Sequence, residues 1–218
     1  MRHFTLPSLL VLVLLPSLAI SEERLGIGPL RTISLARLST VLPADTRVLI
    51  EPAAIESFLV ALEGTPPDWG TVYGHGHHDP GHDERLFNLN RERDARRDGN
   101  PAQQWRVAFI WPGELSRFDA ESGGYAVSVG PALHPTRWGV VRFKPEDLPG
   151  NMRAIPDRAR DKKLRRRLAR KEPVELSVVM VGRLIPEESI IYDFSHDQEG
   201  LGLIMPVVRL EQVKYVIK

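Results

Sequence analysis

Trp105-Arg106-Val107-Ala108-Phe109-Ile110-Trp111 is the stretch at which the period of the apolar residues changes. Its larger apolar side chains stand at every second position, which is the period of a strand whose two faces meet different surroundings. Pro112-Gly113 follows directly. The pattern therefore predicts a strand that ends in a turn at these two residues.

The half of the chain after this stretch is expected to be rich in strands. Apolar and β-branched runs, separated by turns that contain glycine or proline, predict strands at residues 125–129, 138–143, 174–185, 189–194, 203–209 and 211–217. The charged stretch from Asp157 to Lys171 is predicted to be helical. Three strands, one helix and further strands is the order of a small antiparallel barrel of the OB type, with the helix between strands 3 and 4. An open sheet or a sandwich fits the same strands.

The half before this stretch carries helical signals. Pro52, an apolar stripe at every third or fourth residue and then Gly64 predict a helix over 52–63. Asp83 and Gly99 are the start and stop signals of a second helix, which runs to Arg97. This helix is rich in arginine, and we expect it to dock on the strands through arginine–carboxylate pairs. A third helix is predicted over 30–38 and a short strand over 47–50.

These patterns together predict an α+β protein. Residues 1–21 are expected to be a signal peptide, 22–100 a mainly helical region and 101–218 a β-rich region. No internal repeat or low-complexity linker marks the boundary near residue 100. A single integrated domain over 22–218 fits the sequence equally well.

The first residues have the pattern of a secretory signal peptide. Arg2 precedes an apolar run from Leu6 to Ile20, which at about fifteen residues is shorter than the roughly 20 that a membrane-spanning helix needs. Small residues predict cleavage after Ala19 or Ser21. We therefore expect a periplasmic or secreted protein that is not an integral membrane protein after cleavage. An uncleaved N-terminal anchor is the alternative.

Charge and cysteine content exclude several classes of function. The sequence has 29 basic and 28 acidic residues, and loss of Arg2 with the signal peptide would balance them. A balanced total gives no indication of nucleic-acid binding, which requires a concentrated positive surface. The sequence contains no cysteine, so disulfides, thiolate metal ligands and thiol nucleophiles are excluded.

A histidine-rich segment is the first candidate site. Five potential metal ligands fall within eight residues: His75, His77, His78, Asp79 and His82. Imidazole and carboxylate groups bind zinc and other transition metals, so the segment predicts a metal site. Its first part, His-x-His-x-Asp, resembles the start of the His-x-His-x-Asp-His signature of the metallo-β-lactamase fold, with Pro80 in place of the last histidine. The resemblance implies a metal-dependent hydrolase, with His134 and His196 as later ligands. Metal storage and a solvent-exposed polar loop are the alternatives.

A basic segment is the second candidate site. Residues 153–171 contain ten basic and two acidic residues, and Arg165, Arg166 and Arg167 lie at its centre. These three arginines are candidate ligands for an anionic partner such as a phospholipid head group, a lipopolysaccharide phosphate or nucleic acid, of which the balanced total charge makes nucleic acid the least expected. Residues 187–199 carry five acids and no base. A contact between the two segments, or a helix that is merely solvated, is the alternative.

Two other clusters are explained by structure alone. Ser195-His196-Asp197 lie next to one another in sequence, where alternate side chains of an extended chain point apart, and we interpret them as a turn and not as a catalytic triad. The tryptophans are expected to pack in the core or at its rim, with an aromatic binding face as the alternative: Trp69, Trp105, Trp111 and Trp138.

The sequence as a whole predicts an exported envelope protein that acts as a non-enzymatic binding or accessory module. Its expected partner is another envelope protein or an anionic ligand, and no cofactor is needed for this role. The alternative is a metal-dependent hydrolase or metal-binding protein that holds an ion such as zinc in the loop from His75 to Asp83.

Overall fold

The structure is a computed structural model that describes residues 25–74, 79–188, 190–192 and 202–217. Its strands, α-helices and 3-10 helices (η) follow in chain order: β1 (Ile27–Thr32), η1 (Leu35–Val41), β2 (Thr46–Val48), α1 (Pro52–Glu63), α2 (Trp69–Tyr73), α3 (His82–Arg97), η2 (Pro101–Gln104), β3 (Arg106–Asp119), β4 (Gly124–Val129), β5 (His134–Thr136), β6 (Gly139–Val141), β7 (Lys144–Pro145), β8 (Arg153–Ile155), α4 (Arg158–Ala169), β9 (Glu175–Leu184), β10 (Ile191–Tyr192), β11 (Leu203–Ile204) and β12 (Val207–Ile217).

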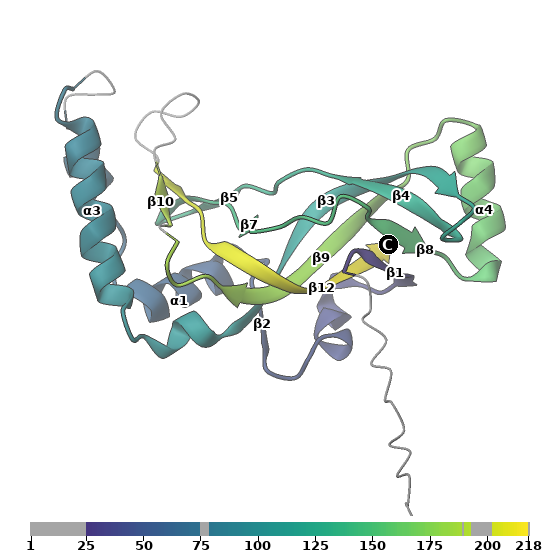
Figure 1. Ribbon diagram of the computed structural model, residues 1–218, viewed down its shortest axis with the longest axis horizontal. Coiled ribbons are helices and arrows are strands. Elements are labelled where there is room, and N and C mark those ends of the chain that lie inside the picture. The colour runs from purple at the N-terminus through teal and green to yellow at the C-terminus, as the bar shows by residue number, and fades with distance from the viewer. Residues whose placement is uncertain (1–24, 75–78, 189, 193–201, 218) are drawn as a thin grey trace, which may run out of the picture.

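Six strands of the described chain close into a mixed β-barrel (Figure 1). They follow one another in the order β1, β8, β4, β3, β9 and β12, and β12 pairs back to β1. The closing strand β1 is parallel to both neighbours, with Gly28 opposite Ala154 of β8 and Leu30 opposite Tyr215 of β12. The other four pairings are antiparallel. The expected α+β class with a barrel is therefore confirmed.

The strands of the barrel separate two apolar layers. Inside it, Phe109 of β3 lies opposite Met180 of β9, and both are fully buried in the main core. The residues that alternate with Phe109 and Met180 along the two strands point outward. There, Ala108 of β3 and Val179 of β9 form a smaller apolar cluster with Leu38 of η1. A strand that is covered on both faces needs apolar residues on both, and this explains why the region around Phe109 is almost continuously apolar.

The prediction of a turn at Pro112-Gly113 is wrong, because β3 continues through both residues to Asp119. Pairing with β4 begins at Gly113, opposite Val129. The Pro112 nitrogen, which has no hydrogen to donate, therefore lies on the β4 side of β3 just past the end of that pairing. The Pro112 carbonyl accepts a hydrogen bond from the Gly130 N–H at 3.1 Å. Proline is tolerated in a strand at such a position, where no ladder hydrogen bond is lost.

The prediction of a helix over 30–38 is also wrong. These residues form the end of β1 and the start of η1. Leu30 is only 2% exposed and lies opposite Tyr215, so pairing within the barrel overrides the local helical pattern. The short strand expected over 47–50 is present as β2, which runs parallel to β3.

The last two strands expected, over 203–209 and 211–217, are divided differently in the structure. β12 is continuous from Val207 to Ile217, with an irregularity in its pairing with β9 between Leu210 and Gln212. Leu203 and Ile204 belong to a second, four-stranded sheet in the order β10, β11, β6 and β5. The strand expected over 189–194 lies partly outside the described residues, and its described part is β10.

The other helix predictions are confirmed as elements. The apolar stripe of α1 is buried, and Gly64 ends the helix with a φ of +85°. α3 does not dock on the strands through carboxylate pairs as expected: its Arg93 and Arg97 both bind Glu63 of α1. α3 also lies against β10, and its Arg93 guanidinium lies 5.9 Å from the ring centroid of Trp138, which directly precedes β6.

The molecule is elongated, with α3 at one end and α4 at the other (Figure 1). The division of the chain at residue 100 stays a prediction, although β1 and β2 place strands of the N-terminal part in the same sheet as β3, β4, β7, β8, β9 and β12. In the described ranges, every helix is too short or too polar to cross a membrane. The signal peptide expected over 1–21 lies outside those ranges.

Candidate anion-binding surface

Helix α4 connects β8 to β9 and covers one end of the barrel (Figure 1). The Asp157 carboxylate caps its first turn by accepting a hydrogen bond from the Arg160 N–H at 2.9 Å. Leu164 is buried in the main core, and Leu168 packs against the same core. These two residues are four positions apart and fix which face of α4 meets the barrel.

Polar contacts fix the same inner face. Asp161 accepts a hydrogen bond from the Tyr125 hydroxyl and another from Arg165 Nε, each at 2.8 Å. The Arg165 guanidinium, and then the Tyr125 hydroxyl, hold the pKa of Asp161 below its ordinary value, so this carboxylate is charged at neutral pH. Arg160 Nη1 donates to the Leu30 carbonyl at 3.1 Å. Asp161 therefore serves the attachment of the helix to β4, whereas Asp157 caps its first turn.

The structure does not bring Arg165, Arg166 and Arg167 together into one site. Consecutive residues of a helix point about 100° apart. Arg165 lies 3.9 Å over the ring of Phe118, and Arg167 Nη2 donates to the Pro173 carbonyl at 2.7 Å. Arg166 is exposed and, alone of the three, forms no ion pair with another described residue.

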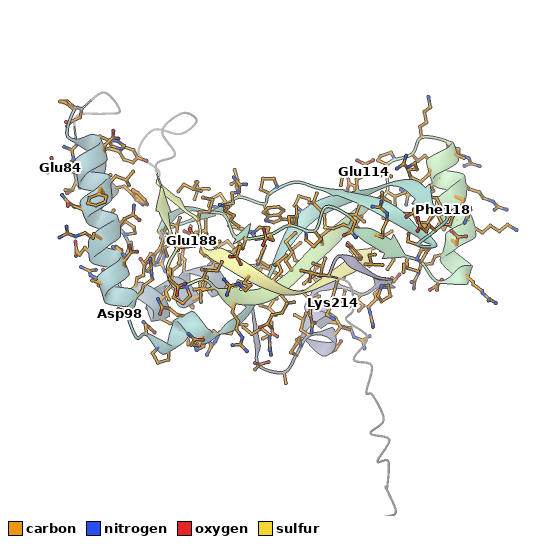
Figure 2. The ribbon with its side chains drawn as sticks, viewed as in Figure 1. Glu84, Asp98, Glu114, Phe118, Glu188 and Lys214 are labelled. Atoms are coloured by element: carbon orange, nitrogen blue, oxygen red, sulfur yellow. The ribbon has the colours of Figure 1, made fainter. Side chains whose placement is uncertain are left out.

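Three other cations share the outer face of α4 with Arg166. Arg158, Lys162 and Arg166 are spaced at four-residue intervals, and Lys163 lies beside them. All four are exposed, and none forms an ion pair within the described part of the chain. Figure 2 shows long side chains of α4 that project away from the barrel. We call Arg158, Lys162, Lys163 and Arg166 the α4 cationic face.

No carboxylate of the described residues forms an ion pair with the α4 cationic face. The remaining outward residues of the helix are Ala159 and Ala169. Arg170, which follows the helix, has Nη1 at 3.7 Å from Glu172 Oε1. Like charges four residues apart destabilise a helix by about 0.2–0.5 kcal/mol per pair. An anionic partner would relieve this repulsion, and none of the four side chains would have to break an ion pair to bind it.

The acidic segment 187–199 begins far from α4. Glu187 and Glu188 precede β10, and Figure 2 shows Glu188 towards the α3 end of the molecule, whereas Phe118 marks the α4 end. These two carboxylates do not neutralise the α4 cationic face. The remaining acids of this segment, together with Ser195, His196 and Asp197, lie outside the described residues.

The histidine-rich segment is described only in part. His75, His77 and His78 lie outside the described residues. Asp79 Oδ2 lies 3.0 Å from Arg85 Nη2, and its Oδ1 accepts a hydrogen bond from the Gly81 N–H at 2.9 Å. The buried ring of His82 stacks on Tyr73 with 5.5 Å between centroids. The described residues contain no group of three or more potential metal ligands. Metal binding by this segment stays a prediction, which elemental analysis of untagged protein would test.

The tryptophans pack against the core, as expected. Trp111 and Trp138 are buried, and Trp69 and Trp105 are partly buried beside them. Trp69 Nε1 donates to the Trp138 carbonyl at 2.6 Å, and Arg47 lies over the Trp105 ring at 3.4 Å. These four rings do not form an aromatic binding face.

Comparison with protein-family models, curated proteins and solved structures finds no match to this chain. The sequence correctly predicts that α4 is helical, but the three consecutive arginines at its centre point in three directions, and their role in anion binding stays a prediction. The four-residue spacing of Arg158, Lys162 and Arg166 around a buried Leu164 is the signal that would have identified the outer face.

Proposed function

We propose that this protein is an exported, non-enzymatic binding module that docks on an anionic envelope surface through the α4 cationic face. The observation that supports the proposal is the group of exposed cations, Arg158, Lys162, Lys163 and Arg166, without a carboxylate partner in the described chain. An exposed Lys or Arg near an anionic membrane contributes about 1 kcal/mol of binding free energy. Four such residues give an attachment that is weak for each side chain and appreciable for the whole face.

The partner that fits this face best is a layer of phosphate groups, such as phospholipid head groups. The inward position of Leu164 and Leu168 leaves no apolar stripe on the outer face for insertion into a membrane. The attachment is therefore electrostatic and peripheral. It weakens as salt is added, because exposed charges are screened over about 8 Å at physiological ionic strength.

We further propose that the barrel is of the OB type, with one added strand. In chain order, β3, β4, β8, α4, β9 and β12 correspond to the first three strands, the helix and the last two strands of such a barrel. Support comes from the order around the barrel, in which β8 and β12 are separated only by β1. OB barrels frequently carry binding sites, but a fold alone does not assign one, so the function rests on α4.

The test is sedimentation of the protein with phospholipid vesicles. The chain is mixed with vesicles of phosphatidylcholine alone or with added phosphatidylglycerol, and the bound fraction is measured against salt. Arg158→Ala/Lys162→Ala/Arg166→Ala removes three cations of the face. We expect affinity for the anionic vesicles to fall by about a hundredfold, from the loss of about 3 kcal/mol.

The control variant is Arg31→Ala/Arg37→Ala/Arg91→Ala, which makes the same change in net charge. These three arginines are exposed and lie outside α4. We expect this variant to retain most of its affinity. Equal losses in the two variants would show that only net charge matters, and binding of the unaltered chain to phosphatidylcholine alone at the same strength would remove the electrostatic basis of the proposal.

A further inference from the structure

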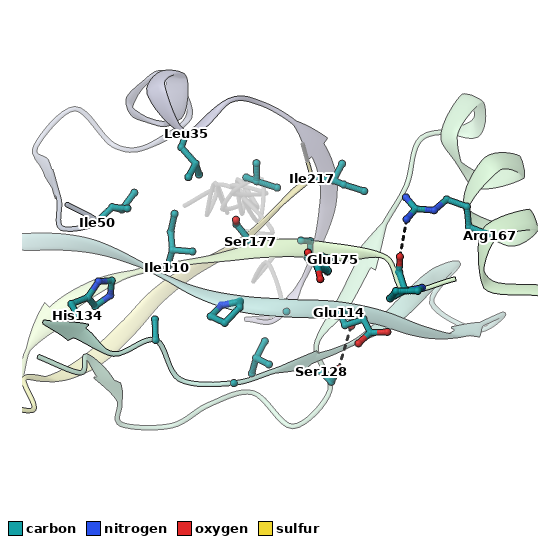
Figure 3. A pocket seen from close by; sticks show the side chains of 18 residues that line it. Leu35, Ile50, Ile110, Glu114, Ser128, His134, Arg167, Glu175, Ser177 and Ile217 are labelled. Atoms are coloured by element: carbon teal, nitrogen blue, oxygen red, sulfur yellow. Dashed lines mark hydrogen bonds between the residues drawn. The ribbon is translucent and has the colours of Figure 1, made fainter. Parts of the chain in front are cut away.

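A groove of about 930 Å³ runs along the outer face of β3 and β9 (Figure 3). Its floor includes Ile110 of β3 and then two pairs of residues that lie opposite each other on the two strands: Pro112 and Ser177, then Glu114 and Glu175. All of these point away from the main core, because successive side chains on a strand alternate. The floor therefore changes from apolar to acidic over four residues, which is about 13 Å.

The apolar end of the groove is enclosed by the N-terminal segment. Leu35 and Ile50 lie beside Ile110, and His134 closes this end from the opposite wall (Figure 3). Burial lowers the pKa of His134 below its ordinary value, an effect that the Glu51 carboxylate partly opposes. The imidazole is therefore neutral at neutral pH, and this end of the groove carries no charge.

The other end of the groove carries two carboxylates with no cation assigned to them. Glu114 and Glu175 lie directly opposite each other and form no ion pair with a described residue. Arg167 lines the same end but is directed elsewhere: its Nη2 donates to the Pro173 carbonyl at 2.7 Å, and its Nε lies 3.6 Å from Glu172. Figure 3 shows Glu114 and Glu175 close together between Ser177 and Arg167.

Like charges placed directly opposite each other on adjacent strands are unfavourable. A cation between Glu114 and Glu175 would remove the repulsion, and an apolar body attached to it would cover Ile110, Leu35 and Ile50. A volume of about 930 Å³ is within the range of small-molecule sites. We propose that this groove binds a cationic amphiphile, that is, a small molecule with one ammonium group and an apolar chain.

A small molecule fits the groove better than a peptide. The floor is the face of a sheet, and the backbone groups of β3 and β9 are already paired with each other and with neighbouring strands. A peptide on this face would find no row of backbone donors and acceptors such as an edge strand offers. An alkylamine has a single polar group, and the two glutamates satisfy it.

The test is calorimetric titration of the chain with octylammonium chloride, with octanol and octanoate as probes of the same apolar chain. We expect saturable binding of octylammonium and binding at least about tenfold weaker for the other two, because a hydrogen-bonded charge is worth at least that factor. Butylammonium should also bind at least about tenfold more weakly than octylammonium, because four methylene groups are lost.

Glu114→Gln/Glu175→Gln removes the acidic end without a change of side-chain shape, and we expect its affinity for octylammonium to fall at least about tenfold. The matched control is Glu84→Gln/Glu121→Gln, at two exposed glutamates outside the groove. It should bind octylammonium as the unaltered chain does. The α4 variant Arg158→Ala/Lys162→Ala/Arg166→Ala should also bind normally, which separates this site from the α4 cationic face.

Three results would overturn the proposal: no saturable binding of octylammonium, equal affinity in the groove and control variants, or octanoate that binds as tightly as octylammonium. A peptide such as acetyl-Leu-Leu-Leu-Lys-amide that binds at least tenfold more tightly than octylammonium would assign the groove to a peptide instead. Both glutamates are exposed, so the variant is expected to fold, and an unchanged urea midpoint or an increased one would confirm it.

Discussion

Glu63 is the most deeply buried charge in the described chain, and it binds two arginines. Its Oε2 lies 2.8 Å from Arg93 Nη1 and its Oε1 lies 2.7 Å from Arg97 Nη1, with side-chain exposures of 1%, 4% and 3% for Glu63, Arg93 and Arg97. Arg97 also binds Asp94. Guanidinium groups suit this arrangement because they stay charged and present several donors in a fixed plane. The single carboxylate thus holds α3 against α1.

Removal of this carboxylate should destabilise the protein strongly. Glu63→Ala leaves two buried guanidinium groups without their shared partner, and we expect the free energy of unfolding in urea to fall by about 3–5 kcal/mol. The control is Glu92→Ala, which removes the exposed partner of Arg96 on the same helix and should cost less than about 1 kcal/mol. Similar losses in both variants would mean that the buried cluster does not hold the helices together.

We expect His134 to make the free energy of unfolding depend on pH. Burial lowers its pKa in the folded state, so between that pKa and the ordinary value near 6.5 the unfolded chain binds more protons. The free energy of unfolding should therefore decrease as the pH falls below about 6.5, by at most about 1.4 kcal/mol per pH unit from this group. His134→Gln should flatten the profile between pH 6.5 and the lower folded pKa, as measured by urea unfolding at each pH. An unaltered slope in the variant would assign the dependence to other groups.

At the scale of single elements, the sequence predicts what local signals determine. α1 is predicted correctly because Pro52, its apolar stripe and Gly64 are all within one segment, and α4 because Asp157 caps a run of helix-forming residues. β1 is missed because its partners, β8 and β12, come much later in the chain, and its own residues give no indication of them.

For the candidate sites too, the sequence predicts what depends on local signals and misses what depends on packing and strand pairing. Charge density identifies α4, but the outward set of cations depends on which side of the helix Leu164 buries, and this is a property of packing. The groove on β3 and β9 could not be predicted, because it requires the pairing of Glu114 with Glu175 across two strands that are separated in sequence by five strands, β4 to β8, and by α4. A side chain on a strand is assigned a neighbour only when the register of the strands is known.

At the scale of the whole molecule, closure of the barrel depends on its first strand. β1 contributes three paired positions to β12 and three to β8, and the Tyr215 hydroxyl donates to the Gly26 carbonyl from within the barrel wall. Leu30 of β1 is part of the main core. The N-terminal segment is therefore an integral part of the barrel and not an appendage to it.

A chain that begins at Ile33 should lose this closure. Without residues 25–32, β8 and β12 present unpaired edges, which are templates for pairing with another chain, and the Tyr215 hydroxyl loses its acceptor. We expect this chain to unfold at a lower urea concentration than one that begins at Leu25, and to form oligomers in size-exclusion chromatography with light scattering. The chain from Leu25 retains all six paired positions of β1 and is expected to remain in its folded form. If the shorter chain eluted in the same way and had the same urea midpoint, closure by β1 would contribute nothing to stability, and the other five strands would have to form a stable open sheet by themselves.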